Sequence, residues 1–520
     1  MPGRVVVQWD KDDCADLGII KIDLLGLGML AVLEECFPLV REHDGIDLDM
    51  AHLPQDDPGV YEMLRRADTI GVFQVESRAQ MATLPRMKPE RFYDLVIEVA
   101  IIRPGPIVGG MVHPYLNRRN QREPVRYLAP GLEEILGRTL GVPLFQEQLL
   151  RMAMAVADFS AGEAEELRRA MGFKRSVERM EQIERKLRTG IANKGINKQD
   201  ENDLVRSITS FALFGFPESH AASFALIAYA SAYLKYYHPA AFFAAMLNCY
   251  PLGFYHPATL IKDAERHGVE LRPIDVAHSN YNCTIENGAL RLGLRYVSGL
   301  RQETGQRVER ERAGRGFESI ADFSARVGPN RRELDLLAYA GAFASFGMTR
   351  RDALWQAAAV EREPGSLLAK AAPRATPTRL PAMSSIEETT ADYAATGLTT
   401  RPHLMMHLRA QLKERGVLSA EELPRARHGS WVKTAGVVIV RQRPGTAKGF
   451  VFVTLEDETG ISNLIVLPDL FQANRALLRS AQILYAEGVL QTVDGVTAIK
   501  ARRFRALSPP GALPASHDFH

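Results

Sequence analysis

An alternation of apolar and polar residues between 430 and 507 constrains the fold of this 520-residue chain more than any other feature. A period of two residues is typical of strands that bury one face. The pattern predicts five strands, with one helix after the third. The strands are expected over 431–442, 450–456, 461–467, 483–491 and 496–505, and the helix over 469–480. The turn residues Asp457-Glu458-Thr459-Gly460 and Asp494-Gly495 separate two pairs of these strands.

Three strands, a helix and two strands is the order of a five-stranded OB-fold β-barrel, and we expect residues 430–507 to form one. Barrels of this kind bind single-stranded nucleic acid or oligosaccharides. Other small barrels share the order and remain alternatives.

The rest of the chain predicts several domains rather than one. A chain of 520 residues is too long for a single core, and roughly three domains are expected. The first 160 residues mix short strands and helices, residues 160–247 are mainly helical, and residues 251–350 are mixed. The Ala-, Pro-, Thr- and Ser-rich stretch 356–400 is typical of a flexible linker. The fold class is therefore multidomain α+β.

Composition excludes several classes of protein. The net charge of +2 supports no argument from overall charge, so any nucleic-acid contact must be local. The four cysteines form no CxxC pair, which argues against zinc and against a disulfide framework and fits a reducing cytosol. The most apolar run, 221–234, is shorter than the roughly 20 residues that span a bilayer, and it predicts a buried helix. The first residues have no signal-peptide pattern.

Near the N-terminus, the segment Ile19–Gly28 predicts a strand that carries one acid, Asp23, among apolar residues. An ionised carboxylate in such surroundings is costly unless it binds a metal or pairs with a cation. Asp23 is therefore either a metal ligand or the ion-pair partner of Lys21, which shares its strand face. We find no convincing second carboxylate nearby, and both alternatives stay open.

Two segments are locally basic. Residues 163–198 hold ten basic residues against six acids, and the acids come first, as the helix dipole favours. A solvated helix face explains this pattern as well as a phosphate-contacting surface centred on Arg168, Arg169, Lys174 and Arg175. Residues 295–351 hold eleven arginines, no lysine and seven acids, with Arg295 and Arg301 as candidates for phosphate contact. Gly293 and Gly299 there indicate a turn, or a hairpin whose backbone N–H groups bind phosphate.

His220 is expected at the N-terminal end of a long helix, where Ser219 is a plausible N-cap. A single histidine in this position is more often a neighbour of the cap than a catalyst. The segments Phe73–Arg78 and Phe145–Gln148 place polar side chains directly after an aromatic residue. Spacing alone predicts no catalytic triad.

Taken together, these segments resemble the bacterial DNA polymerase III alpha-subunit family over nearly the whole chain. The matching motifs are IKIDLLGLGML near 20–30, FQVESR (73–78), RPGP (103–106), FQEQ (145–148), ELRRAMGFKR (166–175) and GFPESHAASFALIAYASAYLKYYHP (215–239). RRELDLLAYAGAF (331–343) resembles the error-prone, damage-tolerance branch in particular.

The resemblance implies a role for each candidate. Asp23 matches the third catalytic aspartate of the palm, which helps to hold two Mg²⁺ ions, and Lys21 would lie near the incoming phosphates. Nucleotide or template contact is implied for the basic motif residues Arg78, Arg103, Arg168, Arg169, Lys174, Arg175 and His220. The implied domains are the end of the palm (1–30), fingers (31–250), a tandem helix-hairpin-helix region (251–355), linker and connecting helices (356–429), OB-fold (430–507) and tail (508–520).

The family's other two catalytic aspartates, its phosphoesterase-like N-terminal domain and its thumb lie upstream of the matched region. We therefore expect this chain to be inactive alone and to act in error-prone, translesion DNA synthesis only with that upstream half. The alternatives are a non-catalytic primer–template binding module and a fragment of a replicative alpha subunit. We find no clamp-binding motif between the hairpins and the barrel. The implied partners are thus primer–template DNA, deoxynucleoside triphosphates and a sliding clamp that is reached through an adaptor resembling an inactive Y-family polymerase. The implied location is the bacterial cytoplasm at the nucleoid, and no membrane partner is expected.

Overall fold

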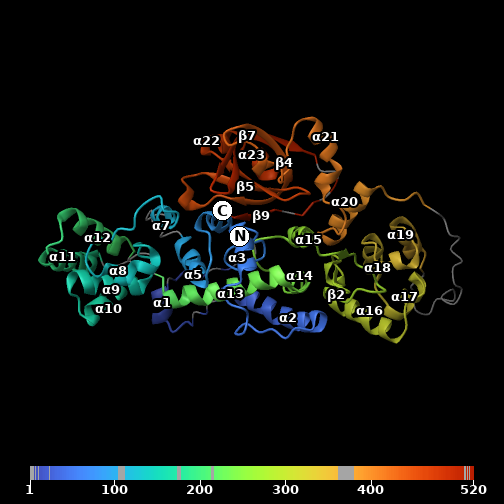
Figure 1. Cartoon of the computed structure of the whole chain (residues 1–520). Helices are drawn as coiled ribbons and strands as arrows, with labels where there is room; N and C mark the ends of the chain where they lie inside the picture. Colours follow the sequence, from blue (N-terminus) through green and yellow to red (C-terminus); the bar gives the residue numbers. More distant parts are fainter. Residues whose placement is uncertain are drawn as a thin grey trace.

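The computed structural model describes residues 5, 7–9, 11–20, 22, 24–103, 112–172, 177–211, 216–360, 380–508, 511, 513–514 and 516–519. Four parts are distinguished in Figure 1: a central helical body, a helical lobe on the left, a second helical region on the right, and a β-barrel above the body. The fold is multidomain α+β, as predicted.

The central body is built around one long helix, α13 (Glu218–Tyr237). Its residues are apolar on all sides, and twelve of the twenty are buried, so it is a core helix, as the apolar run 221–234 predicted. It packs against α2, α3, α5 and α14 (Figure 1). The body also contains α4 and α15. The bounds are α2 (Leu27–Asp44), α3 (Pro58–Arg65), α4 (Arg78–Met87), α5 (Phe92–Ile101), α14 (Pro239–Asn248) and α15 (Pro257–Arg266).

The prediction of Ser219 as the N-cap of α13 is wrong, because Pro217 holds that position and the helix begins at Glu218. Proline fixes its own φ and disfavours helix at the residue before it, so the chain turns into the helix directly after Pro217. His220 lies in the first turn, as expected.

The lobe on the left of Figure 1 has a hydrophobic core of its own, which includes Leu149, Val156, Leu187 and Leu204. Its helix α10 begins with a capping box in which Ser160 and Glu163 exchange side-chain and backbone hydrogen bonds. The helices between residues 112 and 211 are α7 (Val112–Arg119), α8 (Leu132–Leu136), α9 (Gln146–Ala157), α10 (Ala161–Gly172), α11 (Val177–Asn193) and α12 (Lys198–Phe211).

The region on the right of Figure 1 combines a small sheet with four helices. Side chains cap three of these helices: Ser319 caps α17, Asn330 caps α18 and Thr349 caps α19. The elements are β1 (Leu271–Arg272), β2 (Thr284–Glu286), β3 (Ala289–Arg291), α16 (Gln302–Gly314), α17 (Ile320–Val327), α18 (Arg331–Tyr339) and α19 (Arg350–Ala359).

The expectation of a flexible linker over 356–400 is wrong at both described ends, since α19 extends to Ala359 and a further helix follows Ser384. Residues 361–379 lie outside the described part, but the stretch beyond them forms α20 (Ser385–Thr396) with a Ser384–Glu387 capping box. Arg350 of α19 pairs with Asp392 of α20 at 2.6 Å, and Leu398 is buried in the main core. Because these contacts join distant segments, composition alone did not reveal them. The helix α21 (Arg409–Glu414) follows before the barrel.

Residues 431–507 form the predicted barrel, with strands in the order β5-β6-β8-β7-β4 and a β4–β5 pairing that closes it. The third and fifth strands, β6 and β8, pair in parallel, and the other pairings within the barrel are antiparallel. This arrangement is the closed five-stranded barrel of an OB-fold. The bounds are β4 (Trp431–Gln442), β5 (Val451–Glu456), β6 (Ile461–Val466), α22 (Pro468–Ala473), α23 (Arg475–Ser480), β7 (Ile483–Val493) and β8 (Val496–Leu507).

One strand lies in the segment predicted as a tail. β9 (His517–Phe519) pairs in parallel with the end of β4. The Arg441 guanidinium of β4 lies 3.3 Å from the Asp518 carboxylate. A three-residue strand carries too little pattern to be recognised in a sequence.

The expected N-terminal strand is absent from the described residues of 19–28. Ile19, Ile20, Ile22 and Leu24 have no regular structure, Leu25 and Gly26 form a turn, and α2 begins at Leu27. Ile20 is 84% exposed and Leu24 is 68% exposed. A strand needs a pairing partner, and no described strand lies beside this segment. A short helix, α1 (Lys11–Asp16), precedes it.

Among the described helices, none combines the length and the apolar character that crossing a membrane requires.

Candidate functional site

Three of the sequence motifs meet at one place on the central body, which we call the α5–α13 site and define by Arg103, Phe216 and His220. Arg103 follows α5 and its guanidinium lies 3.7 Å from the ring centroid of Phe216. Phe216 comes just before α13, and its ring packs edge-on against His220 at 5.0 Å. The backbone N–H of Gln146, in the third motif, donates to the Phe216 carbonyl at 3.0 Å. An arginine, an aromatic ring and a histidine are thus held side by side.

Only some of the hydrogen-bond donors of the Arg103 guanidinium have partners. Its Nε donates to the Ala100 carbonyl at 2.9 Å, whereas its buried Nη2 has no hydrogen-bond partner within the described structure. Burial lowers the pKa of Arg103 to about 10, so the side chain is a cation at neutral pH. A buried cation with a free donor favours an anionic ligand such as phosphate.

A second arginine borders the α5–α13 site. The Arg138 guanidinium stacks on the Tyr93 ring at 3.5 Å and lies 3.6 Å from the Glu218 carboxylate. The Tyr93 hydroxyl donates to Glu218 at 2.7 Å. Burial, followed by the hydrogen bond to Glu218, raises the pKa of Tyr93 above its ordinary value, so its hydroxyl stays protonated. The Glu218 backbone N–H donates to Glu147 at 3.0 Å, so both acids are engaged at the start of α13.

The segment that carries Asp23 ends against the same helix. Asp23 and Lys21 lie outside the described residues, but Gly26 is described. A Cβ atom built on Gly26 would lie 3.5 Å from the Phe73 ring and 3.8 Å from Ile227 of α13. The Phe73 ring packs edge-on against Phe224 at 5.3 Å, and Phe224 lies 4.3 Å from the His220 ring. A continuous row of rings therefore runs from the end of this segment to the α5–α13 site.

Arg78 lies elsewhere, where the body meets the barrel. Its guanidinium is 4.0 Å from the ring centroid of Phe452 in β5, and its Nη1 has no hydrogen-bond partner among the described groups. Burial lowers the pKa of Arg78 to about 9. A cleft of about 290 Å³ opens beside it between α4, α15 and the turns of the barrel. Arg78 therefore does not share the surroundings of Arg103 and His220, the other motif residues for which nucleotide or template contact was implied.

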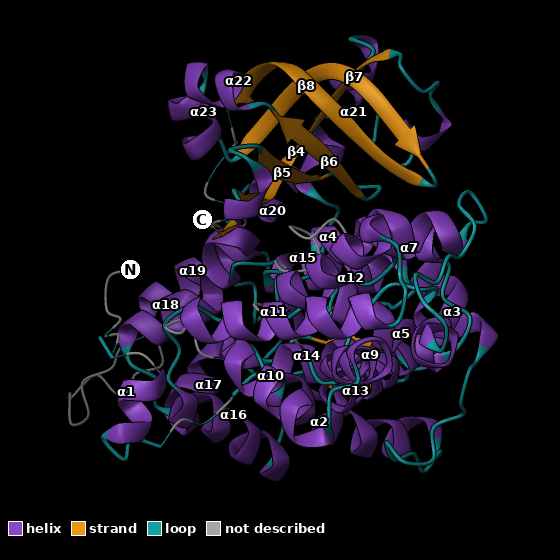
Figure 2. Ribbon diagram, turned by 90° about the vertical axis from the view of Figure 1, so that its left-hand side faces the viewer, coloured by secondary structure: helices purple, strands orange, loops and turns teal. Residues whose placement is uncertain are grey.

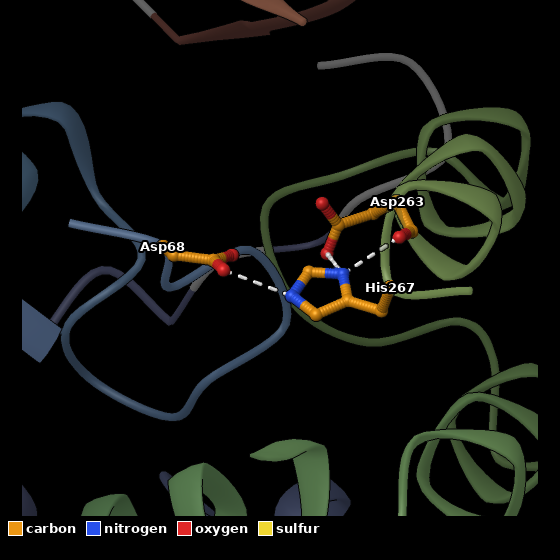
Figure 3. Close-up of side chains that lie close together, drawn as sticks. All are labelled: Asp68, Asp263 and His267. Atoms are coloured by element: carbon orange, nitrogen blue, oxygen red, sulfur yellow. Dashed lines mark hydrogen bonds and ion pairs between the residues drawn. The ribbon is translucent and has the colours of Figure 1, made fainter. Parts of the chain in front are cut away.

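A buried charged cluster lies at one wall of this cleft, formed by Asp68, Lys235, Asp263 and His267 (Figure 3 shows its two acids and the histidine). The Lys235 side chain is 0% exposed and its ammonium lies 3.0 Å from Asp68 and 2.7 Å from Asp263. Burial alone would lower the pKa of Lys235, but the Asp263 and Asp68 charges raise it overall. Burial alone would raise the pKa of Asp68, but Lys235 and then His267 hold it well below its usual range.

The ligand atoms of Asp68, Asp263 and His267 lie within 4.8 Å of one another, close enough for a metal ion. The Lys235 ammonium, however, already supplies a cation to both carboxylates. The His267 Nε2 contacts Asp68 at 2.9 Å. The cluster is therefore an ion-pair network that ties α13 to α15 and to the loop after α3. Its sequence signal is a lysine within an apolar helix, which needs an acidic partner.

The remaining predicted residues are spread over other parts of the chain. Arg168 and Arg169 belong to α10, but their side chains lie outside the described part, as do Lys174 and Arg175 altogether. Elsewhere in the first basic segment, Lys186, Arg188, Lys194 and Lys198 pair with acids of the lobe. These four contacts favour the solvated helix face for that part of the segment.

In the second basic segment, Arg295 lies in a short 3₁₀ turn (Leu294–Tyr296) and donates to the carbonyls of Asn248 and Tyr250. Of the two alternatives for this stretch, the structure therefore shows the plain turn and not the phosphate-binding hairpin. Arg301 forms an ion pair with Glu333 at 2.9 Å and remains half-exposed. Both arginines have structural roles, and neither lies in the α5–α13 site as described.

Comparisons with known proteins agree with this architecture. Residues 29–195 match the bacterial DNA polymerase III alpha subunit finger domain, and residues 268–353 match a helix-hairpin-helix motif. The chain thus belongs to the bacterial DNA polymerase III alpha-subunit family.

Similar curated proteins are named error-prone DNA polymerases. The error-prone DNA polymerase of Anaeromyxobacter sp. (strain K) is 48% identical over 545 residues, which cover 100% of this chain and 48% of the relative. The error-prone DNA polymerase of Methylococcus capsulatus is 47% identical, with 100% and 52% covered, and that of Pseudomonas aeruginosa is 45% identical, with 100% and 51% covered. The chain spans about half the length of these relatives.

Proposed function

We propose that the chain is the fingers-to-barrel half of an error-prone DNA-directed DNA polymerase, which transfers a nucleotide to a primer 3′-hydroxyl during translesion synthesis. In this proposal the α5–α13 site binds the incoming triphosphate. The observation that carries it is the partly unsatisfied guanidinium of Arg103, held by Phe216 beside His220. Phosphoryl transfer depends on positioning the phosphates and on stabilising their charge, and a preorganised arginine supplies both.

The roles of this chain's residues follow from that arrangement. Arg103 donates to a phosphate oxygen through its free nitrogen, and Phe216 keeps the guanidinium plane fixed while this bond forms. The exposed Arg138, stacked on Tyr93, adds a second positive charge at the rim. His220 contacts the nucleotide from the first turn of α13, where the helix dipole also favours an anion. In the proposal Lys21, Arg168, Arg169, Lys174 and Arg175 extend this positive surface.

Polymerases of this family use divalent metal ions, and we propose two Mg²⁺ ions with Asp23 as one ligand. The described residues do not assemble a carboxylate site for them, because Lys235 fills the cluster of Asp68, Asp263 and His267. We therefore assign no step of the reaction to the metal from this structure. Asp23 would need further acidic ligands from outside the described part of the chain.

Primer–template DNA is the proposed macromolecular substrate. The helix-hairpin-helix region would hold the duplex by its backbone, with Arg301 as a candidate contact and Arg295 as a support of the turn. The barrel would bind the single-stranded template. We also propose that the protein reaches a sliding clamp through an adaptor resembling an inactive Y-family polymerase. Its proposed location is the bacterial cytoplasm, at the nucleoid.

A chimera tests the enzymatic part. This chain would replace the matching half of the Pseudomonas aeruginosa relative, and primer extension would be measured with Mg²⁺. We expect the chimera to extend primers and Asp23→Asn to reduce extension at least about a thousandfold, since loss of a transition-state charge partner costs that much. An Asp16→Asn chimera is the control, because Asp16 lies in α1. Normal extension by Asp23→Asn contradicts the assignment.

The second candidate function is a primer–template binding module without chemistry. The helix-hairpin-helix match and the barrel favour it independently of Asp23. Both functions predict DNA binding that weakens steeply with salt. The two functions predict different results for the chimera. If this chain is only a binding module, the chimera does not extend primers, with either Asp or Asn at position 23.

A further inference from the structure

The barrel turns its usual ligand-binding side toward the helical body. OB-folds commonly bind oligonucleotides on the face of their second and third strands and on the loop between the fourth and fifth. Here those elements are β5, β6 and the Asp494-Gly495 turn. Phe452 of β5 lies under Arg78, and Glu456 of β5 accepts hydrogen bonds from Arg266 at 2.8 Å and Thr259 at 3.1 Å.

The turn between β7 and β8 is also engaged. Arg122 forms two hydrogen bonds with the Asp494 carboxylate, at 2.9 and 2.5 Å. A Cβ atom on Gly495 would lie 3.4 Å from Pro85 of α4. Contacts within the chain therefore occupy much of the surface that a single strand commonly uses on such a barrel.

The opposite side of the barrel carries aromatic and basic side chains. Trp431, Arg503 and Arg505 are exposed there, whereas Tyr485 is half-buried against a small core that includes Ala435 and Ile483. In Figure 2, β7 and β8 cross the top of the barrel, away from the helical body. The strand registers place Lys433, Glu487 and Arg503 in one row and Tyr485 beside Arg505 in the next. We define the β4–β7–β8 face by Trp431, Lys433, Tyr485, Glu487, Arg503 and Arg505.

The two aromatic residues of this face are held in place by one carboxylate. The Tyr485 hydroxyl donates to Glu487 at 2.6 Å, and the Trp431 indole N–H also donates to Glu487. The Trp431 side chain nevertheless remains 51% exposed. A large ring that is oriented by a hydrogen bond yet open to solvent is available for stacking.

The charges of the face match one class of ligand. Lys433, Arg503 and Arg505 lie near the aromatic residues in the strand registers. Arg415 is exposed beside them, and its backbone carbonyl accepts a hydrogen bond from Lys433 at 3.0 Å. Glu487 is already engaged by the two rings and lies 4.0 Å from Arg503. Rings that stack on bases and cations that track the backbone together form the pattern of a surface for single-stranded nucleic acid.

We propose that the β4–β7–β8 face binds single-stranded DNA, with a base stacked on Trp431 and the phosphates near Lys433, Arg503 and Arg505. This inference rests on the DNA-binding part of the proposed function and refines it, because it assigns the single strand to the β4–β7–β8 face. It does not depend on the chemistry at Asp23.

Intrinsic fluorescence tests the stacking directly. The chain has three tryptophans, Trp9, Trp355 and Trp431, so the double variant W9F/W355F leaves Trp431 as the sole reporter. Titration with oligo(dT) of about 16 nucleotides should quench its emission, since a stacked base contacts the ring. The converse variant, W9F/W431F, leaves Trp355, which is 55% exposed in α19, as a matched control. Unchanged emission of Trp431 at saturating oligo(dT) overturns the proposal.

Affinity measurements separate this face from the usual one. We expect Trp431→Ala to weaken oligo(dT) binding, measured by fluorescence anisotropy, about tenfold, and Trp355→Ala to leave it unchanged. Arg503→Gln and Arg505→Gln should each lower the slope of log affinity against log salt by about 0.7. If Lys448→Gln, in the loop between the first two strands of the barrel, weakens binding and Trp431→Ala does not, the usual route is used and the proposal is wrong.

The same titrations distinguish failure of this inference from failure of the proposed function. A chain that binds primer–template DNA without a response from Trp431 retains the proposed function and loses the β4–β7–β8 face. A chain that binds neither oligo(dT) nor primer–template DNA loses both. Circular dichroism of each variant verifies that the barrel is folded.

Discussion

The guanidinium of Arg103 lies 3.7 Å from the ring centroid of Phe216, although 113 positions separate the two residues in the sequence. This stacking joins the end of α5 to the start of α13, and Phe216 in turn contacts His220. The buried Nη2 of Arg103 has no hydrogen-bond partner among the described residues. Stacked arginines are well suited to phosphate because less side-chain freedom is lost when the ligand binds.

The first prediction concerns this arginine. In the polymerase chimera, Arg103→Ala should reduce kcat/KM for the incoming nucleotide about 10- to 100-fold, because a hydrogen bond to a charged group contributes about 1.5–3 kcal/mol. Steady-state primer extension at varied nucleotide concentration measures the change. Arg103→Lys should restore only part of the loss, since lysine lacks the planar guanidinium.

Arg425→Ala is the control for that prediction, because Arg425 is exposed and, within the described part of the chain, its ion pair is the local i,i+4 contact with Glu421. It should leave kcat/KM unchanged. Equal losses in the two variants would mean that general charge, rather than the α5–α13 site, governs nucleotide use.

The second prediction concerns the buried lysine of α13. Lys235→Met should destabilise the chain by about 3–5 kcal/mol, since it leaves Asp68 and Asp263 facing each other without their cation. Urea denaturation measures the free energy of unfolding. Replacing both acids as well, in the triple variant Lys235→Met, Asp68→Asn and Asp263→Asn, should recover part of the loss.

The matched control is Lys198, which pairs with Glu201 at 2.8 Å but is largely exposed. Lys198→Met should cost at most about 1 kcal/mol. A similar cost for Lys198→Met and Lys235→Met would show that burial of the cluster adds nothing to stability.

The elements that could be predicted from the sequence depend on local patterns. The period-two alternation of 431–442 predicted β4 to the residue, and the apolar run 221–234 predicted the buried part of α13. The contact of Arg78 with Phe452 joins residues on different domains, and no local pattern encodes such a pairing. For the strand predicted over Ile19–Gly28 the local pattern was present and the tertiary contact was missing. The apolar and polar residues alternate there, but no described strand pairs with the segment.

The candidate site was predictable to a similar degree. Resemblance singled out Arg103 and His220, and the structure brings them together through Phe216. Arg138 and Tyr93 were missed, because a stack between α5 and the turn after α8 leaves no signature in spacing. The orienting role of Glu487 was also missed, since a glutamate on an exposed strand face reads as ordinary solvation.

The last prediction concerns Glu98 of α5, which is fully buried and whose two carboxylate oxygens have no hydrogen-bond partner within the described residues. Burial raises the pKa of Glu98 well above its ordinary value. A carboxyl with a raised pKa in the folded state stabilises that state most at low pH, and stability falls as the pH rises past the unfolded pKa of about 4.3. Glu98→Gln resembles the protonated form in shape and cannot ionise. We therefore expect its melting temperature to match the parent near pH 4 and to exceed it increasingly toward pH 8, as thermal unfolding followed by circular dichroism would measure. The exposed Glu134→Gln should show no such divergence, and a constant difference between Glu98→Gln and the parent at all pH values would mean that Glu98 is not held protonated by its burial.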